Sequence, residues 1–90
     1  MNILLTDQYK KNFNKRISRN VSLVARYRER VLLFMQDVHS PLLHMHILKG
    51  KMKEFRSFSI TGDVRVIYIQ ENKTTILFVD IGTHVQVYGM

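Results

Sequence analysis

The segment HILKGKMKEFRSFSITGDVRVIY, residues 46–68, decides the fold of this chain of 90 residues. Apolar and polar residues alternate over residues 55–61, as they do in strands with one buried face, and residues 64–70 form a second strand-like run. Between these runs lies Gly62-Asp63, a pair that is typical of tight turns. The segment therefore predicts an antiparallel hairpin that follows a basic loop.

Two further strands are predicted on the C-terminal side of this hairpin. Residues 74–81 (TTILFVDI) are almost wholly apolar, as expected of a central strand that is covered on both faces. Gly82 is expected to end that strand. In the following GTHVQVY, His84 and Tyr88 alternate with valines, so a last short strand would carry both on one face.

A first helix is predicted on the N-terminal side of the segment. Tyr9, Phe13 and Ile17 recur at four-residue spacing, which places them on one helical face. Thr6 or Asp7 is the expected N-cap, because its side-chain oxygen can accept a hydrogen bond from a free backbone N–H.

The second predicted helix is the clearest in the chain. Its apolar residues follow three- and four-residue steps, and this stripe is expected to lie in the core: Val24, Tyr27, Val31, Phe34 and Val38. Asn20 is the expected N-cap, and Pro41 is expected to end the helix. Residues 42–54 show neither period cleanly and predict an irregular connection or a short turn of helix.

Together these elements predict an α+β fold, an N-terminal helical hairpin packed on a small antiparallel β-sheet. Residues 3–5 could add a short edge strand. The length fits a single domain over residues 1–90. The free face of the sheet is where a charged groove could form.

Charge is the strongest signal in the composition. Fourteen Lys and Arg against seven Asp and Glu give a net charge of +7, which favours a polyanionic partner, nucleic acid or an acidic protein. The absence of Cys excludes a disulfide framework and thiolate chemistry, and it fits a cytoplasmic protein. The N-terminal apolar run is too short for a signal peptide or a membrane span, so we expect no membrane partner.

The sequence predicts no cofactor. It has neither a P-loop nor a GxGxxG motif. His44-x-His46 resembles a metal-binding pair only weakly, because no Cys and no carboxylate cluster accompanies it, so no metal is expected.

Several polar residues could instead cleave a phosphodiester bond of RNA. Attack by the 2′-OH needs a base, an acid for the leaving oxygen, and cations for the developing charge. Proton transfer could come from His46, Asp63 and His84, and Tyr88 could stack a base or orient a phosphate. The cations available to bind RNA and to stabilise charge are Arg65, Arg56, Lys49, Lys51 and Lys53. From spacing alone, an ordinary surface position is favoured over a catalytic role for most of them.

At these residues the sequence resembles the RelE/ParE superfamily of type II toxin–antitoxin toxins, and most closely its YafQ-like branch. The likeness covers the layout of the whole chain and is most specific in its second half. Five features match. They are a His before Leu-Lys-Gly (His46 and residues 48–50), an aromatic-Arg pair (Phe55-Arg56), an Asp in the hairpin (Asp63), a strand from Arg to Tyr (residues 65–68) and a Gly-Thr-His near the end (residues 82–84).

The resemblance implies a ribosome-dependent endoribonuclease that cuts messenger RNA, stalls translation and is neutralised by an acidic antitoxin. It implies catalytic roles for His46, Asp63 and His84, with an aromatic residue at Tyr88. Arg65 stands where RelE has an arginine that stabilises the transition state.

Two residues depart from the pattern of the branch. Ser59 stands where the branch often has a second His, and Val64 stands where it often has Trp. Whether Ser59 shares a face with Arg65 depends on whether the hairpin turn has two residues or three, which the sequence leaves open.

Two other functions compete with the nuclease. A topoisomerase-poisoning toxin of the ParE type has the same fold, but such toxins lack the terminal Gly-Thr-His pattern that includes His84. A non-catalytic basic RNA-binding module would need the charge and the aromatic residues, but neither His84 nor Asp63. Fold alone does not choose among the three.

Overall fold

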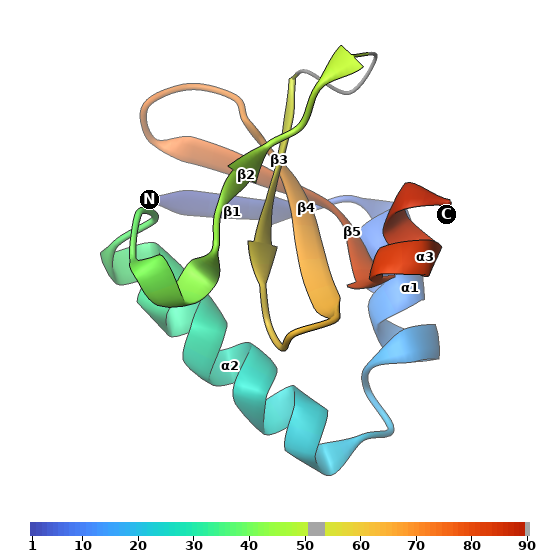
Figure 1. Ribbon diagram of the computed structural model, residues 1–90. Helices are drawn as coiled ribbons and strands as arrows, with labels where there is room; N and C mark the ends of the chain where they lie inside the picture. The colour runs from blue at the N-terminus through green and yellow to red at the C-terminus, as the bar shows by residue number, and fades with distance from the viewer. Residues whose placement is uncertain (51–53, 90) are drawn as a thin grey trace.

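The computed structural model describes residues 1–50 and 54–89, and it confirms the predicted α+β class (Figure 1). The elements, in chain order, are β1 (Asn2–Leu5), α1 (Asp7–Arg16), α2 (Val21–Gln36), the 3-10 helix η1 (Pro41–Leu43), β2 (His46–Ile47), β3 (Phe55–Ser59), β4 (Val64–Gln70), β5 (Thr75–Thr83) and α3 (His84–Tyr88). No helix in the described part of the chain has the length and apolar character needed to cross a membrane.

The five strands form one sheet in the order β1-β5-β4-β3-β2. The three pairs from β2 to β5 are antiparallel, as predicted. β1 pairs with β5 in parallel, so the sheet is mixed. The parallel pair is possible because α1, α2 and the other strands lie between β1 and β5 in the chain, and parallel neighbours need such a long connection.

Both predicted helix caps are present. Thr6 Oγ1 accepts a hydrogen bond from the backbone N–H of Tyr9 at 3.0 Å, and Asn20 Oδ1 accepts from Leu23 N–H at 3.0 Å. Tyr9 and Ile17 of the first stripe are 1% and 2% exposed, so this face of α1 lies in the core.

The prediction that Pro41 ends the second helix was wrong. α2 ends at Gln36, and Asp37 already has an extended backbone with φ −156° and ψ 97°. Its carboxylate accepts a hydrogen bond from His39 N–H at 3.0 Å, a local bond that competes with helical geometry. Pro41 instead begins η1, and Val38 packs against the core from outside the helix.

Four aromatic side chains form the centre of the core between α2 and the sheet. The ring of Phe34 stacks on Phe58 at 4.4 Å between centroids, and it meets Tyr68 edge-on at 5.0 Å and Phe78 at 5.8 Å. All four are at most 1% exposed. Such pairs contribute about 0.5–1.5 kcal/mol each beyond the area that they bury.

A bulge in β5 changes which residues face the core. Tyr68 pairs with Phe78 and Ile67 pairs with Asp80, so Val79 is an extra residue in β5. After the bulge Ile81 is fully buried, and Asp80 is directed toward α1. Although β5 is a central strand, Val79 is only half-buried, so the prediction that both faces are covered was only partly right.

The hairpin turn has three residues. The backbone N–H of Ile60 donates to the Val64 carbonyl at 2.8 Å, which leaves residues 61–63 as the loop. In this register Ser59 and Arg65 lie directly opposite each other, so they share a face of the sheet.

The prediction of a last strand after Gly82 was wrong. β5 continues through Gly82 to Thr83, and residues 84–88 form α3. The reason is a capping box, in which the Thr83 hydroxyl accepts from Gln86 N–H at 3.3 Å and Gln86 Oε1 accepts from Thr83 N–H at 2.8 Å. The two bonds close a helical turn where a strand would have continued.

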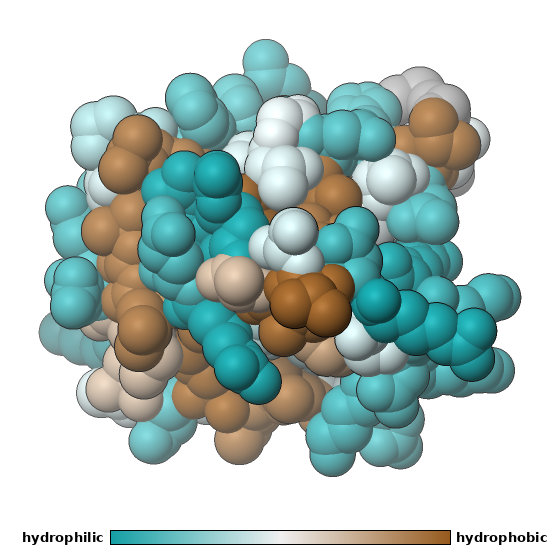
Figure 2. Space-filling model, turned by 90° about the horizontal axis from the view of Figure 1, so that it is seen from below, coloured by the Kyte–Doolittle hydropathy of each residue, from teal (hydrophilic) through white to brown (hydrophobic). Residues whose placement is uncertain are grey.

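The side of the molecule opposite the β2–β3 end is covered by α2 (Figure 1). Seen from that side, apolar patches lie between hydrophilic side chains (Figure 2). The sheet face away from α2 remains available to hold a site.

Candidate active site

A hollow of about 370 Å³ opens where β2, β4 and α3 meet. It is lined by His46, Ile47, Leu48, Lys49, Arg65, His84 and Tyr88. Five of these residues were predicted from the sequence as site residues: the cations Lys49 and Arg65, the histidines His46 and His84, and the aromatic Tyr88. None of the described residues that line the hollow is acidic, so its surface suits an anion.

His84 and Tyr88 lie on one face, as predicted. The reason differs from the predicted one, because they are four residues apart in a helix and not alternate residues of a strand. Their rings are 4.5 Å apart between centroids and meet edge-on at 63°. His84 is exposed and Tyr88 is half-buried, so the imidazole remains accessible to a ligand in the hollow.

Asp63 anchors the start of α3. Its Oδ1 accepts a hydrogen bond from the backbone N–H of His84 at 3.2 Å, and this bond joins the hairpin turn to the helix. Asp63 does not line the hollow, although it was predicted to act beside His84. Its observed contact is therefore with the backbone of His84 and not with the hollow.

Gly82 leaves room at the end of β5 for the side chains of Gln86 from α3 and Arg16 from α1. A Cβ atom at Gly82 would lie 2.6 Å from Gln86 Oε1 and 2.9 Å from an Arg16 guanidinium nitrogen, closer than real contacts of such atoms. A larger residue at the junction of β5 and α3 would force these two side chains to move.

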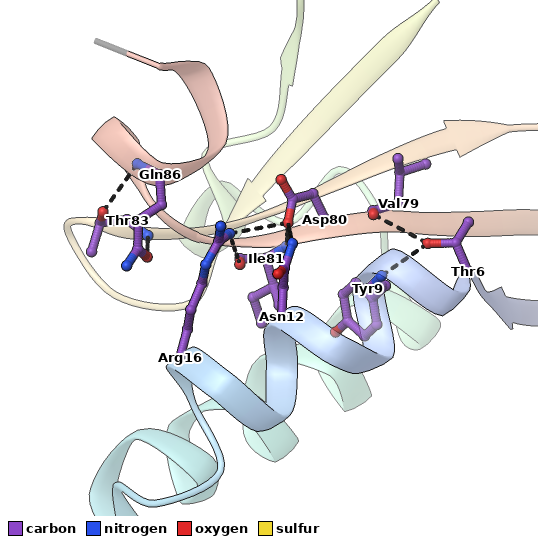
Figure 3. Close-up of polar contacts among 9 residues, drawn as sticks. All are labelled: Thr6, Tyr9, Asn12, Arg16, Val79, Asp80, Ile81, Thr83 and Gln86. Atoms are coloured by element: carbon purple, nitrogen blue, oxygen red, sulfur yellow. Dashed lines mark hydrogen bonds and ion pairs between the residues drawn. The ribbon is translucent and has the colours of Figure 1, made fainter.

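A half-buried polar cluster holds α1 against the last part of β5 (Figure 3). Asp80 Oδ1 accepts from Asn12 Nδ2 at 2.8 Å, from Arg16 at 3.2 Å and from Ile81 N–H at 2.8 Å. Arg16 also donates to the Ile81 carbonyl at 2.9 Å. The ion pair is largely removed from water, with 19% and 13% of the two side chains exposed, and each charge has the partners that burial demands.

Arg65 is held in place by the residue that departs from the family pattern. Its guanidinium donates to Ser59 Oγ at 3.0 Å across the hairpin, and Ser59 is 5% exposed. Because one donor is engaged, the rest of the planar guanidinium has a fixed direction beside the hollow.

The structure does not bring Arg56 to the hollow. Arg56 lies opposite Tyr68 in the β3–β4 register, one residue out of phase with Ser57 and therefore on the other face of the sheet. Burial raises the pKa of Tyr68, and the nearby Arg56 guanidinium opposes that shift. Lys51 and Lys53, which were predicted to bind RNA, lie outside the described residues.

Other residues of this region were not predicted. The pair Thr83-x-x-Gln86 is a capping-box signature that could have revealed α3 from the sequence. Ile47 and Leu48 form the apolar wall of the hollow, for which no sequence signal exists. Among the residues that the structure describes, no three His, Asp or Glu side chains gather in a way that could hold a metal ion.

Comparison with known proteins identifies the family. A family model described as "Bacterial toxin of type II toxin-antitoxin system, YafQ" matches residues 1–89. The chain belongs to the YafQ toxin family. The resemblance seen in the sequence is therefore confirmed, and this YafQ-family chain is a toxin of a type II toxin–antitoxin system.

Solved structures agree with this assignment at the level of the fold. The E. coli DinJ–YafQ complex includes a chain that is 19% identical, with 98% of each chain covered and a TM-score of 0.79. A copper-bound mutant toxin from Helicobacter pylori is 24% identical, with 97% of this chain and 98% of that chain covered and a TM-score of 0.73. A YoeB/ParE toxin from Agrobacterium tumefaciens is 17% identical, with coverages of 93% and 99% and a TM-score of 0.76. No curated protein matches the sequence significantly.

Proposed function

We propose that this toxin is a ribosome-dependent endoribonuclease that cuts messenger RNA and so inhibits translation. One observation carries the proposal, namely that a single hollow is lined by His46, His84, Arg65 and Lys49, with Tyr88 beside them. The hollow offers two groups that can move protons near neutral pH and two cations, which is the set that cleavage of RNA by its own 2′-OH requires.

In the proposed reaction one imidazole takes the proton of the 2′-OH as the oxygen attacks the adjacent phosphorus atom. The other imidazole gives a proton to the departing 5′-oxygen, so that a 2′,3′-cyclic phosphate and a 5′-hydroxyl are formed. No metal and no cofactor is needed to balance this step.

The remaining residues stabilise charge and orient the substrate. Arg65, held by Ser59, offers a planar fork to the phosphorane oxygens, which carry most of the charge in the transition state. Tyr88 can stack a base, because its ring lies edge-on to His84 at the mouth of the same hollow. Lys49 contributes positive charge for the backbone phosphates, and Lys51 and Lys53 follow it in the sequence.

Asp63 has a positioning role in this proposal. Its carboxylate accepts the backbone N–H of His84 and so sets where α3 begins, rather than exchanging a proton with the substrate.

The proposed partners are the ribosome and messenger RNA of the cytoplasm, and an acidic antitoxin. The E. coli YafQ structures include complexes with DinJ, and the net charge of +7 on this chain favours an acidic protein. Such binding should be fast and should weaken as salt is added.

The test compares His84→Ala with the wild type in a cleavage assay on translating ribosomes. Loss of one proton-transfer group should slow cleavage by about 10²–10⁴-fold. His39→Ala is the matched control, because His39 is also exposed but does not line the hollow. Circular dichroism should show that all three proteins are folded.

Two results would contradict the proposal. Equal cleavage by His84→Ala and wild type would remove His84 from the reaction. Toxicity without cleavage by either protein would favour the topoisomerase or RNA-binding alternatives.

A further inference from the structure

A second, smaller pocket lies at the edge of the sheet, between α2 and the turn that joins β3 to β4. Its volume is about 130 Å³. The residues that line it are Arg26, Arg30, Leu42, His44, Ser59, Ile60, Thr61 and Gly62. In Figure 1 the β3–β4 turn lies on the same side of the sheet end as α2, and residues of both segments line the pocket.

The pocket concentrates positive charge that the protein itself does not neutralise well. Arg26 and Arg30 are one helical turn apart on α2, a spacing at which like charges repel and destabilise a helix. The Arg30 side chain is only 15% exposed, yet its ion pair with Glu29 is long, at 3.7 Å, and Glu29 is 65% exposed. None of the described residues that line the pocket is acidic.

His44 enters this pocket from a strained backbone. Its φ of 46° and ψ of 49° lie in the left-handed region, which few residues other than glycine adopt. This conformation follows η1 directly and leads the chain into β2. Backbone strain of this kind is often found at binding sites, where the surrounding fold holds a residue in a useful position.

One side chain connects the pocket to the candidate active site. Ser59 lines the pocket, and its hydroxyl accepts the hydrogen bond from Arg65, which lines the hollow. The two concave sites are therefore separated by a single hydrogen-bonded pair, so one extended anionic chain could contact both.

We propose that this pocket binds a backbone phosphate of the same RNA strand whose scissile phosphate lies in the hollow. Two guanidinium groups give the planar donors that suit phosphate oxygens, and occupation by an anion relieves the repulsion between Arg26 and Arg30. RNA is favoured over an acidic peptide because the pocket continues from the hollow through Ser59. The inference deepens the proposed function and rests on it.

The first experiment asks whether the pocket binds phosphate. Inorganic phosphate replaces chloride at constant ionic strength while amide signals of the whole chain are followed by NMR. The amides of Thr61, Gly62 and His44 should shift in a saturable way in the wild type. In Arg26→Gln/Arg30→Gln these shifts should be lost, whereas in the matched double variant Arg19→Gln/Arg28→Gln, which removes the same charge from exposed positions, they should remain.

The second experiment asks whether the phosphate belongs to RNA. The probe is a single-stranded 2′-O-methyl oligouridylate, which cannot be cut by attack of its own 2′-OH, so binding is measured without any cleavage. Loss of one phosphate contact should reduce the slope of log affinity against log salt by about 0.7 in Arg26→Gln/Arg30→Gln relative to the control variant. Affinity at low salt should fall about tenfold, the change that corresponds to one charge-assisted contact.

The outcomes separate this inference from the nuclease itself. Phosphate shifts that are equal in both double variants would overturn the pocket. Phosphate shifts at the pocket with equal salt slopes would overturn the assignment to RNA and indicate another anion, such as an acidic side chain of a partner. Neither readout depends on cleavage, so a failure of the His84→Ala test leaves both results interpretable.

Discussion

Replacing Gly82 by Ala should displace α3 and with it the candidate catalytic histidine. The new Cβ would lie 2.6 Å from Gln86 Oε1, 2.9 Å from an Arg16 nitrogen and 3.0 Å from Gln86 Cβ. The first two atoms can move, because they end flexible side chains. In moving, they would weaken the bond that Gln86 Oε1 accepts from Thr83 N–H and the bonds that Arg16 donates to Asp80 and Ile81.

The expected cost follows from those bonds. Loss of one such hydrogen bond costs about 0.5–1.5 kcal/mol, and an overpacked methyl group costs about 1–3 kcal/mol where the surroundings do not yield. We expect Gly82→Ala to lower the free energy of unfolding by about 1–3 kcal/mol. For a domain of this size that corresponds to a melting temperature lower by roughly 5–20 °C.

Urea unfolding measures this change, and Gly62→Ala is the matched control. A Cβ at Gly62 would meet nothing within 4 Å, and its φ is not in the left-handed region. The control should therefore keep or slightly raise the stability, by up to about 1 kcal/mol, because alanine has less conformational freedom than glycine in the unfolded chain.

A double-mutant cycle with Gln86→Ala assigns the cost to a contact. Removing the Gln86 amide relieves the shortest clash, so the two changes together should be less harmful than their sum by at least about 0.5 kcal/mol. Cleavage by Gly82→Ala should fall more than that by Gly62→Ala at a temperature where both remain folded. Equal stabilities for the two single variants would refute the close approach of Gln86 and Arg16 to Gly82.

Three further results are expected. Ser59→Ala should slow RNA cleavage more than it weakens RNA binding, because Arg65 loses the bond that directs it while Arg26 and Arg30 remain in the second pocket. An equal loss of binding would show that Arg65 only attracts RNA. Asp63→Asn keeps an oxygen acceptor for His84 N–H and should cleave RNA at nearly the wild-type rate, whereas Asp63→Ala should cleave it more slowly. Equal losses of cleavage rate in the two variants would mean that the negative charge of Asp63 is needed. Burial raises the pKa of the Tyr9 hydroxyl above its ordinary value of 10.0, so above about pH 10 the unfolded state loses this proton first. The free energy of unfolding should then fall by up to about 1.4 kcal/mol per pH unit. In urea unfolding, Tyr9→Phe should reduce this pH dependence, and an unchanged pH dependence would contradict the burial argument.

Local signals in the sequence were sufficient for the helical hairpin and the strand hairpin. The N-caps Thr6 and Asn20 were predictable because a short side chain with an oxygen atom precedes an apolar stripe, and both caps are present. The parallel pairing of β1 with β5 was not predictable, because it joins segments about seventy residues apart and leaves no local pattern. The bulge at Val79 is likewise decided by the partner strand.

The C-terminal segment shows why periodicity can mislead over a short stretch. His84, Gln86 and Tyr88 satisfy a two-residue period, but His84 and Tyr88 also satisfy a four-residue one. The capping box at Thr83 decides in favour of the helix, whereas the prediction of a strand followed the two-residue alternation. Both conformations place His84 and Tyr88 on one face, so this feature of the site was predicted correctly although the element was not.

The candidate site was predictable from resemblance more than from spacing. His46 and His84 line the same hollow because the strand order brings β2 and α3 to the same region of the sheet, which no sequence motif indicates. Arg56 shows the converse, because its phase in β3 directs it to the other face although it lies next to the basic loop.

The position of His84 therefore depends on elements far from it in the sequence. An isolated helix of five residues is not stable in water, so α3 must take its stability from its anchors. These anchors are the capping box, the Asp63 carboxylate and the close contact of Gln86 with Gly82, next to which Arg16 of α1 bonds to β5. Because the Arg16–Asp80 pair is largely buried, removing Arg16 would leave a carboxylate without its counter-charge, and that is strongly destabilising. Although α1 carries no residue of the hollow, its Arg16 therefore supports the end of β5 from which α3 begins, and loss of that support should disturb the position of His84.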